Sequence, residues 1–404
     1  METKKTEQQR SAGKRFATIF WNDDISAAHL YKDVGGIPYA LAKYCGWQTT
    51  LVYSDINGRL QDEKYEKYVQ LRTIHYSKAC QRMKLKWLKY FRVMQFVWRH
   101  AADYDVLNFY HVDKLIMFLC WLAKKRNPQV LTYVKMDMAA DGFRTMMKQE
   151  QRGNFSLANL FMPAVDLFTV ETKKFADVLR EKISCIRRIE YLPNGFFEEL
   201  MCIPGKDQLP AKDNLLLTVG FLGTWQKNTE LLVQALIQIP TEKLIGWKVI
   251  LVGHAEPAFL TWLYKVQEEY PVLKECLVLT GVIRDKAKLA ELYTKARAFV
   301  LPSREEACAL VIPEAMSFGD YLIVTDCCDA FHEYIDTTED HGFGKIVPNE
   351  DAAALQEAIE EVLDGRVDAV KRGKLAGKYA REHLDWQVVA KNLDCLLRMK
   401  SLKD

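Results

Sequence analysis

The order of apolar segments along the chain constrains its fold more than any other feature. From Arg15 onward, short runs rich in β-branched and aromatic residues alternate with stretches whose apolar residues recur at helical spacing. This alternation is typical of doubly wound parallel sheets, in which helices cover both faces. Two such series follow one another, separated by a stretch with prolines and lysines at 193–214. The sequence therefore predicts an α/β protein with two Rossmann-like domains facing a cleft.

Each series supplies its own strand candidates. In the first series these are 16–21, 49–53, 106–109, 130–134, 167–170 and 188–192. In the second they are 215–219, 247–252, 276–280, 298–301, 321–325 and 344–346. We expect an N-terminal domain over 1–205 and a C-terminal domain over 206–385. Helical patterns predict helices over 351–363 and 386–399, and we expect residues 386–404 to pack back on the first domain.

Composition excludes several classes of protein. A chain of 404 residues suits two domains of roughly 200 residues each. Its 56 basic residues are nearly balanced by 53 acidic ones, so net charge gives no argument for nucleic acid. The ten cysteines lie mostly in apolar runs without zinc-like spacing. No signal peptide or spanning segment is evident, so we expect a reduced, cytoplasmic protein.

The most specific stretch, PSREEACALVIPEAMSFG, runs from Pro302 to Gly319 and joins an apolar strand to a helix. Such junctions lie at the carboxyl edge of an open α/β sheet, where ligands bind, and backbone amides at a helix start suit a diphosphate. Glu306 in the loop is placed to reach a sugar, and Glu314 in the helix to accept hydrogen bonds from ribose. Taken alone, the pair would more simply be a loop carboxylate and a solvated helix residue.

This stretch resembles the C-terminal signature of glycosyltransferase family 4, whose members are retaining, nucleotide-sugar-dependent enzymes of the GT-B fold. The matching residues are Pro302, Ser303, Glu306, Glu314, Ala315, Met316 and Gly319. Residues 251–253 with Gly281, Val282, Tyr293 and Ala296 resemble the family's run towards its base-binding loop. The resemblance implies the GT-B fold, which is the arrangement of two Rossmann-like domains that the alternation indicates.

The segment TVGFLGTWQKN, at 218–228, resembles the loop that carries the family's phosphate-binding Arg and Lys. Lys227 matches the Lys, whereas Phe221 stands where the Arg is expected. The resemblance implies that a UDP- or GDP-sugar donor binds here. The residues expected to bind it are Gly35, Gly36, Lys227, Val282, Arg304, Ala309, Leu310, Val311 and Glu314. No Asp-x-Asp pair lies in a suitable context, so we expect no metal and no obligatory cofactor.

The N-terminal half resembles the family more loosely. Gly35 and Gly36 open a helix where such enzymes approach the donor, although a turn that needs positive φ would explain them equally well. His111 follows a strand, and the resemblance implies a catalytic role facing the acceptor or the transferred sugar; a structural histidine is the alternative. Lys135 and Asp137 end the next strand and are expected on the acceptor side, the alternative being a local ion pair.

A segment without acidic residues extends from 67 to 102. It contains nine Lys or Arg, interleaved with Trp87, Tyr90, Phe91, Phe96 and Trp98. On a helix, this pattern suits docking to an anionic membrane surface. A helix pair that buries the aromatics is the alternative. We therefore expect peripheral contact at the inner membrane face through 67–102.

Together these features predict a retaining glycosyltransferase that moves a hexosyl group from a nucleotide sugar to a hydroxyl acceptor. The acceptor is expected to be a glycan, a lipid-linked sugar or a protein, with no nucleic acid involved. The resemblance assigns Glu306 to sugar positioning and charge stabilisation, and His111 to the reacting groups. Phe221 keeps open a non-catalytic GT-B subunit that binds a partner glycosyltransferase or a glycan. An epimerase or a phosphorylase on the same scaffold fits less well.

Overall fold

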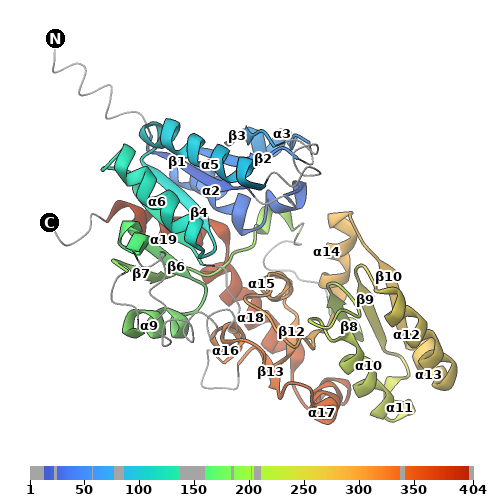
Figure 1. Cartoon of the computed structure of the whole chain (residues 1–404). Helices are drawn as coiled ribbons and strands as arrows, with labels where there is room; N and C mark the ends of the chain where they lie inside the picture. Colours follow the sequence, from blue (N-terminus) through green and yellow to red (C-terminus); the bar gives the residue numbers. More distant parts are fainter. Residues whose placement is uncertain are drawn as a thin grey trace. The chain divides into compact units, whose positions relative to one another are not determined.

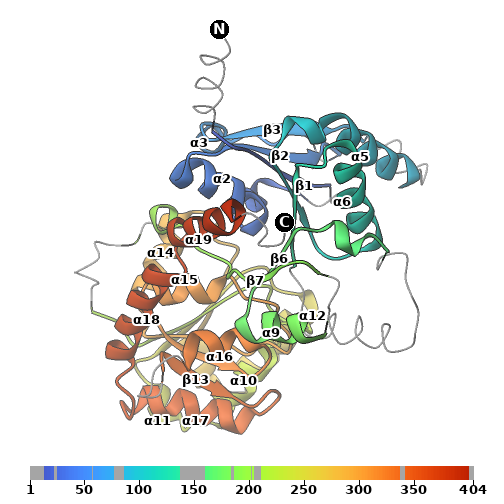
Figure 2. The same ribbon diagram turned by 90° about the vertical axis from the view of Figure 1, so that its left-hand side faces the viewer.

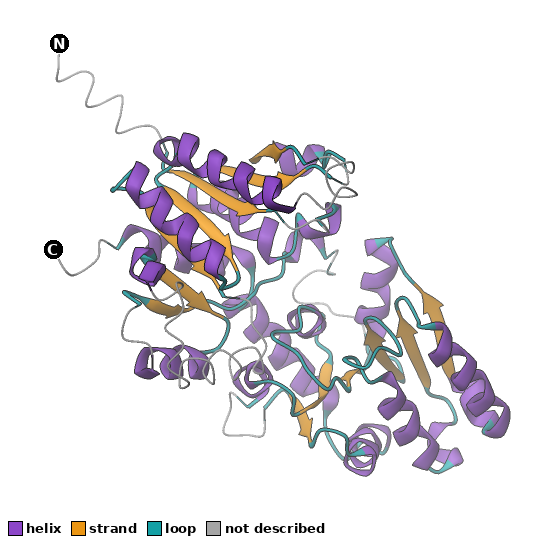
Figure 3. Cartoon of the chain, viewed as in Figure 1, coloured by secondary structure: helices purple, strands orange, loops and turns teal. Residues whose placement is uncertain are grey.

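The chain forms two compact units. A computed structural model describes residues 13–21, 25–56, 58–76, 86–136, 160–182, 186–201, 203, 211–336 and 342–399. One unit comprises residues 1–195 together with 386–404, and the other comprises residues 196–385. In each unit, helices cover a parallel sheet (Figure 3).

The sheet of the first unit has seven parallel strands among the described residues, in the order β3-β2-β1-β4-β5-β6-β7. The strands are β1 (Arg15–Phe20), β2 (Gln48–Ser54), β3 (Val69–Ile74), β4 (Val106–Tyr110), β5 (Leu131–Lys135), β6 (Leu167–Val170) and β7 (Ile189–Tyr191). The helices are α2 (Asp33–Cys45), α3 (Glu63–Glu66), α5 (Lys86–His100), α6 (Lys114–Arg126), α9 (Lys173–Lys182) and α19 (Trp386–Arg398).

The core of the first unit follows from the alternation of side chains along its strands. Ala17 and Ile19 of β1 pack with Val93 and Val97 of α5, and α6 contributes a further apolar row to the same core. Helices α5 and α6 lie side by side over the sheet (Figure 1). Buried central strands such as β1 are apolar on both faces because helices cover both sides of a parallel sheet.

The last helix, α19, packs against α2 within the first unit. Trp386, 1% exposed, begins this helix, and its ring lies beside Gly36 of α2. Further along, the Trp47 indole donates to Asp394 over 2.6 Å. The chain thus leaves the first unit after Gly195 and returns to it at Trp386. Helix α19 then lies beside α2 (Figure 2).

The second unit has six parallel strands among the described residues, in the order β10-β9-β8-β11-β12-β13. The strands are β8 (Leu215–Val219), β9 (Lys248–Val252), β10 (Leu277–Gly281), β11 (Ala298–Leu301), β12 (Tyr321–Thr325) and β13 (Gly344–Val347). The helices are α10 (Thr229–Gln238), α11 (Thr241–Leu244), α12 (Pro257–Glu269), α13 (Pro271–Cys276), α14 (Lys286–Lys295), α15 (Val311–Ser317), α16 (Asp329–Ile335), α17 (Ala352–Leu363) and α18 (Ala369–His383).

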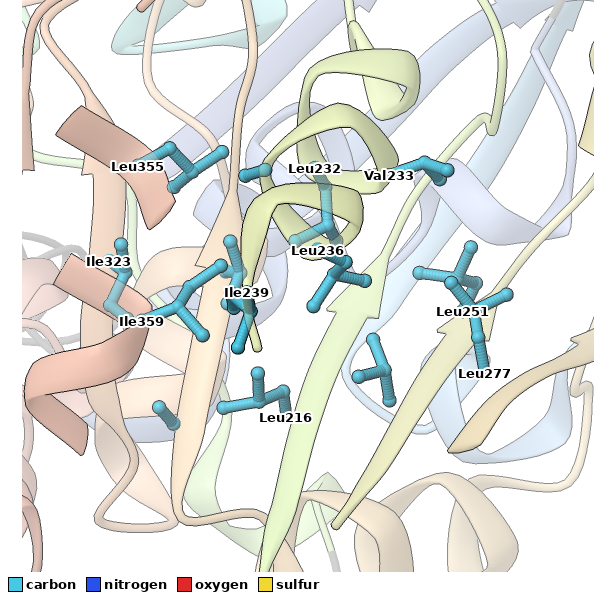
Figure 4. Packing of buried hydrophobic residues seen from close by; sticks show 14 of the residues in the cluster. Leu216, Leu232, Val233, Leu236, Ile239, Leu251, Leu277, Ile323, Leu355 and Ile359 are labelled. Carbon is cyan, nitrogen blue, oxygen red and sulfur yellow. The ribbon is translucent and has the colours of Figure 1, made fainter. Parts of the chain in front are cut away.

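Strand β8 shows how this sheet separates two apolar layers. Leu216 points into the layer shared with Leu232 and Leu236 of α10 and with Ile359 of α17 (Figure 4). Leu215 and Leu217, its neighbours along the strand, belong to the layer on the other side. Because successive side chains of a strand point to opposite faces, three consecutive leucines fill both layers.

The expected fold class, two parallel Rossmann-like sheets, is confirmed. Every expected strand is present with its ends within one or two residues of the expected ones, and α17 and α19 occupy the two expected helical segments. Strand β3 was not expected. It lies inside 67–102, where we expected a helix, and its sequence VQLRTI is too polar to stand out as a buried strand because it lies at the sheet edge.

None of the helices in the described part of the chain has both the length and the apolar composition needed to cross a bilayer.

Candidate functional site

The carboxyl edge of the second sheet is built on glycines. The amide of Gly220, after β8, donates to the Val252 carbonyl, and that of Gly253 donates to the Gly281 carbonyl. Gly253 has φ 144°, and a Cβ there would lie 1.7 Å from the Gly220 oxygen. Only glycine allows this approach. The ends of β8, β9 and β10 therefore form a close-packed backbone edge where a ligand of an α/β sheet is expected to lie.

Lys227 and Glu306 meet at this edge. The Lys227 ammonium lies 2.5 Å from Oε1 of Glu306, and the Ser303 hydroxyl donates to the same oxygen over 2.6 Å. Glu306 is 6% exposed, whereas Lys227 is only partly buried. The β8–α10 loop supplies the lysine and the β11–α15 loop supplies both partners. The two residues that the sequence assigned to the phosphate and to the sugar are thus in direct contact.

Arg304 joins three loops at the same edge. Its guanidinium pairs with Glu350, donates to the Trp225 carbonyl over 2.8 Å and lies over the Trp225 ring at 5.7 Å. The Arg304 backbone amide also donates to the Gln226 carbonyl over 2.8 Å. These contacts hold the loop that carries Lys227 against the loop that carries Glu306.

Sequence reasoning missed Glu350 and Asn228, which complete this network. The Asn228 side chain lies 3.5 Å from Glu350, and both residues have positive φ, 46° and 62°. A non-glycine residue with positive φ is uncommon and often occurs at functional sites. Glu350 follows β13 outside every motif considered, so a sequence pattern gave no signal for it.

Glu314 lies in α15 and contacts a different partner. The Tyr293 hydroxyl donates to Glu314 over 3.4 Å. Burial, followed by the charge of Glu314, raises the pKa of Tyr293 well above its ordinary value, so the hydroxyl stays protonated and remains a donor. The Tyr293 ring stacks on the Phe318 ring with 5.3 Å between their centroids, which fixes the orientation of the hydroxyl towards Glu314 of α15.

The remaining expected donor residues of this unit lie around α15 and β10. Ala309 is buried, and Leu310 and Val311 are half-buried at the start of α15. Val282 follows β10 and is 59% exposed. Phe221, which stands where the resemblance predicts an arginine, is 63% exposed at the end of β8. Among the described residues, no three His, Cys, Asp or Glu side chains gather as ligands of a metal ion.

Gly35 and Gly36 belong to the first unit, where they lie in the first turn of α2. A Cβ at Gly35 would lie 2.3 Å from the Leu30 carbonyl oxygen, and a Cβ at Gly36 would lie 3.1 Å from the Trp386 ring. Neither glycine has positive φ. Close packing of backbone and indole against α2 therefore accounts for both residues, whereas a left-handed turn does not.

His111 follows β4 directly and has φ 65°. It is exposed, its amide donates to the Lys135 carbonyl, and its ring lies 6.3 Å from the Phe20 ring. Positive φ in a histidine at the carboxyl end of a strand is the kind of backbone strain that functional sites carry.

Lys135, at the end of β5, is fully buried. Its ammonium lies 3.4 Å from Glu171, which also accepts from the Asn194 side chain over 2.5 Å. Lys135 therefore forms an ion pair, and the partner that the structure shows is Glu171. Asp137, the expected neighbour, lies outside the described residues.

Comparisons with known proteins fit this geometry. Residues 213–365 match the model of the family described as Glycosyl transferases group 1. Over 114 residues, 28% of this chain, the sequence is 29% identical to the serotype-specific mannosyltransferase WbdA of Escherichia coli. The aligned part spans 14% of that relative's length.

Solved structures resemble nearly the whole chain. Sucrose-phosphate synthase from Thermosynechococcus elongatus has a TM-score of 0.71 at 21% identity, covering 95% of this chain and 98% of that one. Anabaena Alr3699/HepE in complex with UDP-glucose has a TM-score of 0.66 at 14% identity, covering 95% and 99%. These likenesses define the class of fold as GT-B. Within that fold, the match to group 1 glycosyl transferases lies in the second unit.

Proposed function

We propose that the chain is a retaining glycosyltransferase of family 4. It moves a hexosyl group from a UDP- or GDP-sugar to a hydroxyl acceptor in glycan, glycolipid or glycoprotein biosynthesis. The observation that carries this proposal is the cluster of Lys227, Glu306 and Ser303 at the carboxyl edge of the second sheet. UDP-glucose in Alr3699/HepE, a structure of the same fold, supports the class of donor.

The second unit binds the donor in this proposal. Lys227, Arg304 and the amides of 309–311 face the diphosphate, Glu314 accepts from ribose hydroxyls, and Val282 contacts the base. As the glycosidic bond to the diphosphate breaks, negative charge grows on the leaving oxygen, and fixed positive charge stabilises it without an obligatory metal.

Glu306 positions the sugar and stabilises the positive charge that develops on its ring. It is not assigned as a nucleophile, because the family that the motif resembles does not require one. The acceptor hydroxyl forms the new bond to the anomeric carbon on the face that the diphosphate leaves, which retains the configuration. Its proton passes to the departing diphosphate oxygen.

The first unit holds the acceptor. His111, Lys135 and Asp137 are the residues proposed on this side. Because Lys135 is fully buried beside Glu171, the role proposed for it is to fix the end of β5 rather than to contact the acceptor. We place the activity in the cytoplasm, at the inner membrane face when the acceptor is lipid-linked.

Phe221 supports one alternative, a non-catalytic subunit that binds a partner glycosyltransferase or a glycan. The resemblance predicts a cation at this position, and an exposed phenylalanine cannot compensate phosphate charge. In the favoured function, Arg304 supplies the second cation.

A panel of nucleotide sugars tests the proposal. The matching donor stabilises the folded protein by mass action, so its midpoint of thermal unfolding rises with donor concentration. With that donor and a suitable acceptor, NMR of the product should show the anomeric configuration of the donor. If no UDP- or GDP-sugar shifts the midpoint even at millimolar concentration, the non-catalytic function is the better account.

A further inference from the structure

Glu350 lies in the loop between β13 and α17, in a backbone conformation that its residue type disfavours. Its φ is 62°, in the left-handed region where glycine and asparagine are the usual residues. The Glu350 amide donates to the side-chain oxygen of Asn349 over 3.1 Å. A glutamate in this region costs free energy because its Cβ crowds the backbone. The turn would be more stable with glycine, so the Glu350 side chain needs an explanation of its own.

The Glu350 carboxylate holds the guanidinium of Arg304. One carboxylate oxygen accepts from Nε of Arg304, and the other accepts from Nη2 over 3.3 Å. The hydrogen bond from Arg304 lowers the pKa of Glu350 below its ordinary value, so the carboxylate is charged at neutral pH. Paired contacts of this kind fix the plane of a guanidinium as well as its position.

Stability does not explain this ion pair. The Arg304 side chain is 24% exposed and the Glu350 side chain is 54% exposed. Exposed ion pairs contribute little to the free energy of unfolding, since water solvates and screens both charges. The unfavourable backbone conformation at Glu350 is better explained by the place in which the carboxylate holds Arg304.

Glu350 reaches both loops that carry the cations of the candidate site. Besides Arg304, it contacts the side chain of Asn228, which follows Lys227 directly and is 1% exposed. The Asn349 side chain donates to the Arg304 carbonyl over 3.0 Å, so the same loop also holds the backbone of Arg304. The loop between β13 and α17 thus connects the β8–α10 loop to the β11–α15 loop.

The guanidinium of Arg304 keeps donors for a further partner. In the part of the chain that the structure describes, Glu350 accepts from two of its N–H groups, and the Trp225 carbonyl accepts from a third over 2.8 Å. An arginine side chain has five N–H donors, so two remain outside these contacts. Glu350 therefore orients the cation and still leaves it able to bind an anion. Phe221, where the resemblance predicts an arginine, has no such donor in its side chain.

We propose that Glu350 is a positioning residue of the donor site, which orients Arg304 so that its remaining N–H groups bind the diphosphate of the nucleotide sugar. This inference rests on the proposed function, because it concerns how the same donor is held. Glu350 acts through Arg304 and does not contact the donor. Its own negative charge repels a diphosphate, so removing it weakens binding only if positioning outweighs repulsion.

The test is calorimetric titration of UDP and GDP into variants of the full chain. Glu350→Gly should weaken binding of the preferred nucleotide about tenfold, because Arg304 loses its orientation. Its midpoint of thermal unfolding should not fall, since glycine suits positive φ. Arg304→Met should weaken binding at least as much. Adding Glu350→Gly to Arg304→Met should cause no further loss, because a residue that acts through another has no effect once the other is gone.

Two controls separate positioning from general effects. Glu361→Gln removes a carboxylate from another ion pair of the second unit, with Lys345 at 3.2 Å, and should leave nucleotide affinity unchanged. Uridine and guanosine lack phosphate, so ligand-detected NMR should show that the preferred nucleoside binds Glu350→Gly as it binds the natural chain. A variant whose site no longer folded would lose the nucleoside as well.

Three results would overturn the inference. These are unchanged or tighter nucleotide binding by Glu350→Gly, additive losses in the double variant, or a loss of nucleoside binding equal to that of the nucleotide. In each case the natural chain still binds UDP or GDP, so the proposed function stands. If neither nucleotide binds the natural chain, the proposed function and this inference fail together.

Discussion

At the scale of single residues, the second unit contains a buried ion pair between Lys212 and Asp320. The Lys212 ammonium donates to Asp320 over 2.6 Å and to the carbonyls of Phe318 and Tyr293 over 2.8 and 3.1 Å. This lysine ties the segment before β8 to the turn before β12. Burial raises the pKa of Asp320 from 3.8 to about 7, and the attraction of Lys212 opposes that rise.

Lys212→Met should destabilise the protein by about 3–5 kcal/mol at pH 8, because it leaves the Asp320 carboxylate buried without its cation. A raised pKa in the folded state means that folding takes up a proton between the ordinary pKa and the raised one. Without Lys212 the pKa of Asp320 in the folded state rises further. The deficit relative to the natural chain should therefore shrink as pH falls towards about 7, where Asp320 of the natural chain also takes up its proton, and should stay constant below that pH. Urea unfolding at several pH values measures it. A deficit independent of pH, or one that Asp320→Leu fails to relieve, would contradict this account.

The sequence predicted some residues of the candidate site and missed others for a physical reason. Glu306 and Lys227 were both assigned to the donor, and the structure brings them into contact. Their contiguous motifs lie on loops that meet at the same edge of the sheet. Glu350 could not be predicted, because its importance comes from a loop-to-loop contact and backbone strain rather than from a pattern. Asn228 ends the matched segment 218–228, but the segment gave it no role of its own.

At the scale of elements, the carboxyl edge of the second sheet restricts most strongly which residues the chain can have, because it is built on closely packed glycines. Gly220 follows β8 and Gly253 follows β9, and the carbonyl of Gly220 leaves no room for a side chain at Gly253. Central strands such as β8 and β11 were predicted well because buried strands in a parallel sheet are continuous apolar runs. Edge strand β3 was missed because a strand with exposed residues lacks that signal.

Gly253→Ala should cost roughly 1–3 kcal/mol from backbone strain, and more from overlap with the Gly220 carbonyl. The control is Gly246→Ala, since Gly246 has φ 82° but nothing within 4 Å of an added Cβ. It should lose only about 1–2 kcal/mol from the left-handed backbone. Chemical denaturation compares the two variants. Equal losses of stability in the two variants would contradict this expectation, because they would mean that β9 moves away from β8 without a cost in free energy.

At the scale of the whole molecule, the two units are linked by the chain twice, after Gly195 and before Trp386. The helix that completes the first unit therefore reaches it only after the second unit has been synthesised. Sequence patterns predicted both sheets, because each depends on local alternation. The sequence analysis also expected residues 386–404 to pack on the first domain. Which helix they contact there, α2, is set by packing between distant segments, which periodicity alone does not encode.

Trp386→Ala should destabilise the first unit by about 3–5 kcal/mol, because it empties a buried site between α19 and α2. Hydrogen exchange, read separately for the two units, should show faster exchange in α2 and β2 and little change in α10 or β8. Faster exchange confined to the second unit would contradict the assignment of α19 to the first.

In the proposed function the Lys227 ammonium binds the diphosphate of the donor, and the Glu306 carboxylate, which contacts this ammonium in the structure, competes with the diphosphate for it. Calorimetric titration of UDP and GDP into the natural chain, Lys227→Met and Glu306→Gln tests it most directly. Lys227→Met should weaken binding of the preferred nucleotide tenfold or more, through loss of a charge-assisted contact. Glu306→Gln should leave affinity unchanged or raise it, because it removes the carboxylate that holds Lys227 at 2.5 Å. Unchanged affinity in Lys227→Met, or equal weakening in both variants, would contradict the account.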